Sequence, residues 1–179
     1  MPRFLTGHFD CRVRGIANLR ELQKQMTRRL LLDTAMAQFT AKGYAATTID
    51  DIAVSAGTTR TTFYLHFPSK AAVVLEAIRD LDAIFTGADD PPLDVVVERG
   101  ERALIEQWLD RKFDQWVDAK PYLVAAYQAG PTDPEIDTAM QHWFEETTSA
   151  MVAGLDAADR FEPQTRRIRC VLAFGEFEY

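Results

Sequence analysis

The sequence has 179 residues, of which 47% are hydrophobic and 26% are charged, and this balance excludes a disordered chain and favours a globular one with a sizeable core. No apolar run approaches the roughly 20 residues that span a bilayer, and residues 1–10 lack the pattern of a secretory signal. We therefore expect a cytoplasmic protein with no membrane partner.

The net charge of −7 is unevenly distributed along the chain. Up to Asp80 there are 11 Lys and Arg against 7 Asp and Glu, whereas from Leu81 onward there are 9 against 20. This asymmetry favours a basic binding module carried on an acidic body, and it places a contact with nucleic acid in the first half of the chain.

Catalytic and metal-binding motifs are not evident in the sequence. The histidines His8, His66 and His142 are scattered, and no nucleophile elbow, P-loop or metal-ligand spacing accompanies them. Cys11 and Cys170 are far apart, which favours two free thiols over a disulfide or a metal site. We expect a protein that is not an enzyme, with no cofactor and no metal.

Residues 1–26 hold five basic side chains with little helical periodicity: Arg3, Arg12, Arg14, Arg20 and Lys24. One interpretation is a flexible basic arm that follows DNA phosphates or enters the minor groove. The alternatives are a disordered tail and a start of translation at Met26. The sequence leaves these open.

Residues 27–42 have the pattern of an amphipathic helix, and Thr27 is a candidate N-cap. Four apolar residues recur at helical spacing on one face: Leu32, Ala35, Met36 and Phe39. Gly43 follows as a stop signal, and Tyr44 is expected to pack rather than to contact a ligand. This helix should support the segment that comes next.

Residues 47–70 have the order of a helix-turn-helix. Thr48 stands at an N-cap, and Asp51, three residues later, can complete a capping box. Gly57 is expected to end the first helix in the left-handed conformation, and a second helix should run from about Thr59 to His66.

Phe63 and Phe67 are four residues apart and therefore share the inward face of that second helix. Its first turn then points outward. Pro68 cannot extend the helix, and Ser69 can cap a third one. In a helix-turn-helix the second helix enters the major groove of DNA.

At these residues the chain resembles the TetR family of bacterial transcriptional regulators. The matching positions keep the family spacing without a gap: Thr48, Ile52, Ala53, Ala56, Gly57, Thr58, Thr59, Tyr64, His66, Phe67 and Lys70. Thr58 replaces the usual valine, and Thr61 stands where glycine or proline is common. The specific resemblance covers about residues 28–78. It implies an all-α fold and a homodimeric repressor that binds a palindromic operator in double-stranded DNA.

The chemistry of the side chains assigns roles within the second helix. Arg60 has the planar donor fork that suits guanine in the major groove, with a solvated surface residue as the alternative. Thr61 and Thr62 can offer a hydroxyl to a base edge or a methyl group to thymine. Thr59 and Thr48, each at a helix start, are placed for phosphate oxygens.

Three further residues extend this candidate interface. The resemblance implies that Tyr64 and Lys70 clamp phosphates. For His66, a phosphate contact and a hydrogen bond to a local backbone group are equally open. Asp50 would repel phosphate unless it complements the helix dipole as an acid of the first turn.

A linking helix should run from Ser69 to about Phe85, and residues 87–92 (GADDPP) form the clearest break in the sequence. We expect a DNA-binding domain over residues 27–86 and an effector-binding and dimerisation domain over residues 93–179. The helices expected in the second domain are Leu93–Ala119, Tyr122–Ala129 with Pro121 as the interruption, Pro134–Leu155 and Glu162–Tyr179.

The second domain concentrates aromatic residues, from which we expect a pocket for a small apolar or aromatic effector. Its candidate lining residues are Trp108, Phe113, Trp116, Tyr127, Trp143 and Phe144. Plain core packing is the alternative for each of them. The helices number about eight, whereas the family has nine or more and dimerises through the last two, so the dimer surface is incomplete, differently built or truncated here. A helical ligand-binding or protein-interaction module without DNA binding is the alternative function.

Overall fold

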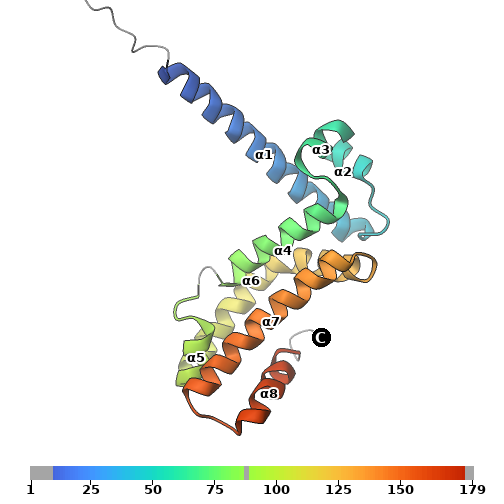
Figure 1. Ribbon diagram of the computed structural model, residues 1–179. Coiled ribbons are helices and arrows are strands. Elements are labelled where there is room, and N and C mark those ends of the chain that lie inside the picture. The colour runs from blue at the N-terminus through green and yellow to red at the C-terminus, as the bar shows by residue number, and fades with distance from the viewer. Residues whose placement is uncertain (1–9, 87–88, 176–179) are drawn as a thin grey trace, which may run out of the picture.

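The computed structural model describes residues 10–86 and 89–175, and every regular element in these two stretches is helical (Figure 1). The elements in chain order are α1 (Asp10–Lys42), α2 (Ile49–Ser55), α3 (Arg60–His66), α4 (Lys70–Thr86), α5 (Leu93–Arg99), α6 (Arg102–Ala129), the 3-10 turn η1 (Gly130–Thr132), α7 (Pro134–Ala157) and α8 (Pro163–Gly175). The all-α class expected from the sequence is confirmed.

The C-terminal half of α1 supplies the core on which α2 and α3 rest. The predicted stripe is buried, and none of its four side chains is exposed by more than 4%: Leu32, Ala35, Met36 and Phe39. Ile52 of α2 and Phe63 of α3 are fully buried in the same cluster. The helix ends at Lys42, and Gly43 follows with a positive φ of 84°. Tyr44 packs on Phe39 with ring centroids 5.1 Å apart, as expected for a packing residue.

The start of α1 differs from the expectation. The helix begins at Asp10 rather than at Thr27, whose hydroxyl donates to the Gln23 carbonyl within the helix instead of capping it. Residues 10–26, expected as a flexible arm, are therefore helical, and residues 1–9 lie outside the described stretches. The segment is rich in Leu, Glu, Gln, Lys, Met and Arg, which are residues of high helix propensity. In Figure 1 it projects well beyond α2 and α3.

The linking helix α4 runs from the α1–α3 group into the body formed by α5–α8 (Figure 1). Its residues Val73, Val74, Ala77 and Leu81 are fully buried. Two hydrogen bonds also connect α1 and its following turn directly to α6. The Arg29 guanidinium donates to the Tyr122 hydroxyl at 3.1 Å, and the Tyr44 N–H donates to Gln128 Oε1 at 2.8 Å.

The helices of the body have other bounds than the sequence predicted. The expected helix over residues 93–119 is divided at Gly100, a left-handed C-cap with φ 60° whose N–H donates to the Val96 carbonyl at 3.0 Å. Pro121 does not interrupt α6, which continues to Ala129. Buried residues on both sides of the proline, including Ala119 and Leu123, hold the helix against its neighbours. Tertiary packing thus outweighs the local signal of Pro121.

Helix α7 lies close to α5 because Gly154 has no side chain. A Cβ atom there would stand 2.7 Å from Val97 Cβ and closer still to the Asp94 carbonyl oxygen. The last helix, α8, is anchored by Arg166, which donates to Asp156 at 2.7 Å and to Asp159 at 2.8 Å. Residues 176–179 of the helix expected up to Tyr179 lie outside the described stretches.

Candidate nucleic-acid interface

A capping box fixes the start of α2, as the sequence predicted. Thr48 Oγ1 accepts the Asp51 N–H at 3.1 Å, and Asp51 Oδ2 accepts the Thr48 N–H at 3.0 Å. The hydrogen bond from the Thr48 backbone, then that from its side chain and that from Lys42, lower the pKa of Asp51 to about 2. The Thr48 hydroxyl is thus occupied at the cap, and its contact with phosphate stays a prediction.

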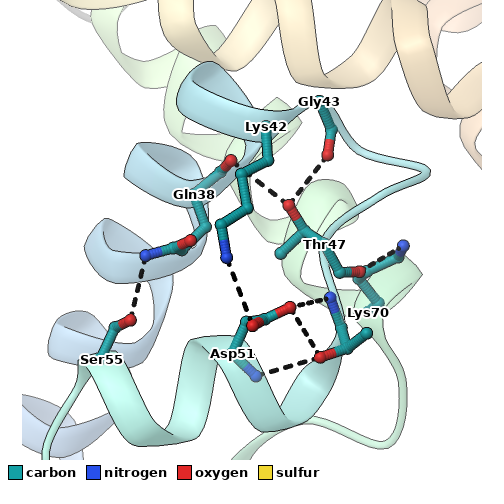
Figure 2. A network of polar contacts seen from close by, with 8 residues as sticks. Gln38, Lys42, Gly43, Thr47, Asp51, Ser55 and Lys70 are labelled. Atoms are coloured by element: carbon teal, nitrogen blue, oxygen red, sulfur yellow. Dashed lines mark hydrogen bonds and ion pairs between the residues drawn. The ribbon is translucent and has the colours of Figure 1, made fainter.

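Polar contacts also fasten α2 to α1 (Figure 2). Gln38 donates to Ser55 Oγ at 3.0 Å, and Lys42 pairs with Asp51 at 3.3 Å. The buried Thr47 hydroxyl donates to the Gly43 carbonyl at 2.8 Å, so this polar side chain is satisfied inside the protein. These contacts hold the first helix of the pair at a fixed place on α1.

The turn between α2 and α3 depends on Gly57. Its φ of 65° lies in the left-handed region, where a side chain would be strained, so the predicted role is confirmed. The N–H groups of Gly57 and Thr58 donate to the carbonyls of Val54 and Ala53 at 3.0 and 2.8 Å. The turn thereby leaves few free carbonyls at the end of α2 and directs the chain into α3.

One side of α3 is anchored and the other faces solvent. Thr59 is the N-cap, and its hydroxyl accepts the Thr62 N–H at 3.1 Å. Phe63 and Phe67 are fully buried, with ring centroids 5.8 Å apart. The candidate contact residues then divide by exposure. Those exposed are Thr48, Thr59, Arg60, Thr61 and Tyr64, and those half-buried are Thr62, His66 and Lys70.

Arg60 does not extend freely into solvent. Its Nη1 lies 2.8 Å from Asp50 Oδ2 of α2, and its Nη2 lies 3.4 Å from the Tyr64 hydroxyl one turn along α3. The hydrogen bond to Asp50, followed by that to Tyr64, raises the pKa of Arg60. Asp50, suspected of repelling phosphate, therefore meets the guanidinium that is expected to read a base.

Lys70 is directed inward rather than toward solvent. Its ammonium donates to the carbonyls of Tyr44 and Thr47 at 2.5 and 2.9 Å and lies 4.1 Å from the Tyr44 ring centroid. Burial lowers the pKa of Lys70. The lysine thus ties α4 to the turn before α2 (Figure 2), and a phosphate contact by it stays a prediction.

The end of α3 is fixed by a residue that the sequence reasoning missed. Arg28 of α1 donates to the His66 carbonyl, and its Nε donates to Glu76 of α4 at 2.9 Å. Its guanidinium also lies 4.1 Å from the Phe67 ring centroid. Burial, followed by the charges of Arg28 and Lys24, lowers the pKa of His66. The sequence around Arg28 does not reveal this role, because its partner Glu76 lies 48 residues later in the chain.

Comparison with known proteins decides the identity of this interface. Residues 31–77, which hold α2, α3 and their supports, match the family profile "Bacterial regulatory proteins, tetR family". Residues 31–77 thus form a DNA-binding domain of the TetR family. The match covers the residues from which the resemblance was inferred, so that inference is confirmed.

Three relatives described as HTH-type regulators show how far the similarity extends. The chain is 29% identical to the transcriptional regulator EthR of Mycolicibacterium smegmatis over 127 residues, 69% of this chain and 58% of EthR. It is 35% identical to the transcriptional repressor KstR2 of Rhodococcus jostii over 108 residues, 59% of this chain and 50% of KstR2. With the negative regulator IcaR of Staphylococcus aureus it shares 37% over 49 residues, 27% of this chain and 26% of IcaR.

The matched region therefore spans little more than half the length of these relatives at most. Within residues 10–86 and 89–175, no helix is long and apolar enough to cross a membrane. The same residues contain no group of three or more His, Cys, Asp or Glu that could hold a metal ion.

The six aromatic residues expected around an effector do not share one interior space in this chain. Trp143 and Phe144 are half-buried with ring centroids 5.3 Å apart, and Trp108 donates its indole N–H to Asp89 at 3.2 Å. The other three are 41–62% exposed on α6: Phe113, Trp116 and Tyr127. These three side chains are therefore not part of the hydrophobic core of this chain. Effector contact by any of the six stays a prediction.

Proposed function

We propose that this TetR-family chain is a DNA-binding transcriptional regulator that inserts α3 into the major groove. The observation that supports this most is the two-sided character of α3, whose buried Phe63 and Phe67 leave Arg60, Thr61 and Tyr64 exposed together. An exposed arginine and threonine at the start of such a helix are suited to base edges. Residues 27–86 would form the DNA-binding domain and residues 93–179 the effector and dimerisation domain.

The regulator would act as a homodimer on a palindromic operator. Helix α8 supports this, because its outer face exposes Ile168, Val171 and Leu172 by 45–63%. An apolar strip of this kind is suited to burial against a second copy. Two copies would then place their α3 helices in half-sites about one helical turn apart.

The regulator would be a repressor that responds to a small effector in the body. The similarity to KstR2, a repressor, and to IcaR, a negative regulator, supports repression. Arg28 supports communication between α3 and the linking helix α4, because it contacts both the end of α3 and Glu76 of α4. An effector that favours one position of α4 would shift the affinity for DNA through this link. Such a regulator would work in the cytoplasm and catalyse no reaction.

A second candidate function is a helical ligand-binding or interaction module without DNA binding. The engagement of Arg60 by Asp50 and of Lys70 by backbone carbonyls favours it, because both cations already have partners inside the chain. The ion pair of Arg60 is exposed, however, and exposed pairs of this kind are exchanged at little cost. We therefore prefer the regulator.

A shift assay on the DNA flanking the gene, together with a gel-filtration mass, tests the proposal. We expect a dimer that retards one fragment, and a loss of retardation in Arg60→Ala and Thr61→Ala. Arg102→Ala is the matched control, because Arg102 lies on α6 with a side chain 90% exposed. A folded dimer that retards no fragment, or an Arg60→Ala variant that binds as well as the parent protein, would contradict the regulator and favour the second candidate.

A further inference from the structure

Arg111 of α6 is a half-buried cation, and two of its three guanidinium nitrogen atoms are buried without an acceptor among the described residues. It recurs at helical spacing with the half-buried Leu104, Gln115 and Tyr122 and the buried Ala129, on the side of α6 that faces the other helices. Its Nε and Nη2 atoms are buried, and neither has a hydrogen-bond partner among the described residues. A guanidinium held in this way is costly unless an anion meets it.

The carboxylate that lies against this part of α6 is already committed to other groups. Asp89 Oδ1 accepts from the Lys112 ammonium at 2.7 Å, and Asp89 Oδ2 accepts from the Trp108 indole at 3.2 Å. The side chains of Asp89 and Lys112 are only 9% and 14% exposed, so this pair is largely enclosed. Lys112 and Asp89 therefore pair with each other, and Asp89 is not an acceptor for Arg111.

A second buried donor comes from the facing helix α7. Trp143 Nε1 is buried and has no partner within residues 10–86 and 89–175. The Trp143 ring centroid lies 5.9 Å from that of Phe85, at the end of α4. Lys112, the residue after Arg111, donates to the Phe85 carbonyl and lies 5.6 Å from the centroid of its ring. Phe85 thus contacts both the α6 segment that carries Arg111 and the Trp143 ring of α7.

Aromatic rings border the Trp143 donor and lead to the surface. Phe144 and Phe174 lie 5.3 and 6.1 Å from Trp143, centroid to centroid. Both also line a hollow of about 370 Å³ between α7 and α8. Two buried donors next to an apolar wall are suited to a ligand with an anionic end and an apolar body.

We propose that the body of this protein binds a small organic carboxylate between α4, α6 and α7, with Arg111 as the residue that recognises the anion. The guanidinium donates from Nε and Nη2 to the two carboxylate oxygens, which is the paired geometry that arginine offers. The Trp143 indole N–H donates a further hydrogen bond, and Phe85, Phe144 and Phe174 contact the apolar part. This proposal names the chemical class of the effector in the proposed function. It rests on that function only for the expectation that the carboxylate changes the affinity for DNA.

The test measures binding to the full chain without DNA. The probes are carboxylates of increasing apolar size, namely acetate, octanoate, decanoate, phenylacetate and indole-3-acetate, each beside its neutral amide at equal ionic strength. We expect the larger carboxylates to raise Tm and to change tryptophan fluorescence, and the amides to bind at least tenfold more weakly. If no carboxylate stabilises the protein more than its amide, the inference is wrong.

Variants then assign the site. Arg111→Gln should weaken carboxylate binding roughly ten- to hundredfold, because a charge-assisted hydrogen bond is lost, while Arg102→Gln on the same helix should leave it unchanged. Trp143→Phe should weaken it less and retain the preference for acids over amides. Arg111→Met removes the two unpaired donors and should raise the Tm of the ligand-free protein while abolishing the response to carboxylates. A carboxylate response that persists in Arg111→Met would overturn the assignment.

Failure here can be separated from failure of the proposed function. Operator binding without any response to carboxylates would leave the regulator intact and reject the anion site. A carboxylate response that depends on Arg111, in a protein that retards no DNA, would support the anion site and reject the regulator.

Discussion

Arg60 of α3 and Asp50 of α2 form an ion pair across the helix-turn-helix, with Nη1 2.8 Å from Oδ2. Both side chains are more than half exposed, at 58% and 59%, so the pair lies on the surface that α3 presents to solvent. Asp50 therefore acts on Arg60 in two opposite ways. It orients the guanidinium, and in the proposed complex with DNA it would compete with guanine and phosphate for it.

This relationship predicts different effects for the two substitutions. Arg60→Ala should weaken operator binding roughly five- to hundredfold and relax specificity at one base pair. Asp50→Asn should strengthen binding to unrelated DNA several-fold at low salt, because one negative charge leaves the interface, and should reduce discrimination at the same base pair. Titrations of operator variants at two salt concentrations measure both effects. Equal discrimination in Asp50→Asn and the parent protein would show that Asp50 does not position Arg60.

The anchor of α3 predicts a contrast between two neighbouring side chains. Phe63→Ala should lower the free energy of unfolding by about 3–5 kcal/mol, because it leaves a cavity in a fully buried position. Leu65→Ala on the same helix should change it by less than about 0.5 kcal/mol, because Leu65 is 74% exposed. Urea denaturation of both variants gives the comparison. Similar losses for the two would mean that α3 is not anchored on this face.

The crossing of α5 and α7 predicts a large effect for a single methyl group. In Gly154→Ala the new Cβ would meet the Asp94 carbonyl and Val97 of α5, so the two helices must separate. We expect a loss of about 1–3 kcal/mol in stability, although alanine favours helix over glycine by about 1 kcal/mol. Gly175→Ala in α8 is the control, because a Cβ there would meet no heavy atom of the described residues within 4 Å beyond the adjoining backbone of α8. Thermal unfolding of the two variants tests this, and equal Tm values would contradict the close crossing.

The comparison of sequence and structure separates local signals from distant ones. The cap at Thr48 and the turn at Gly57 were predicted, because each depends on partners within five residues. The contacts of Arg28 and Lys70 were not predicted, because their partners are distant in the sequence. Arg28 contacts Glu76, 48 residues later, and Lys70 contacts Tyr44, 26 residues earlier.

The predicted bounds of several helices were wrong because the prediction relied on local signals alone, whereas packing between helices also decides where a helix ends. Pro121 predicted a break in α6 that packing overrides, and the weak periodicity of residues 10–26 concealed a segment of good helix formers. The aromatic residues were recognised, but a single sequence does not show which face of α6 the other helices cover. Phe113 was therefore expected inside and is 62% exposed.

The environment of His66 predicts how stability depends on pH. Burial and the nearby charges of Arg28 and Lys24 hold the pKa of His66 below its ordinary value, so the unfolded chain takes up a proton near pH 6.5 before the folded chain does. The contribution of His66 is therefore fully present above about pH 6.5 and decreases as the pH falls through the lower folded pKa. Urea midpoints measured at pH 7.5 and pH 5.5 should show this loss, and it should be smaller in His66→Gln. His142→Gln is the matched control, because the His142 side chain is 74% exposed. If His142→Gln reduces the loss as much as His66→Gln does, the pH dependence does not originate at the end of α3.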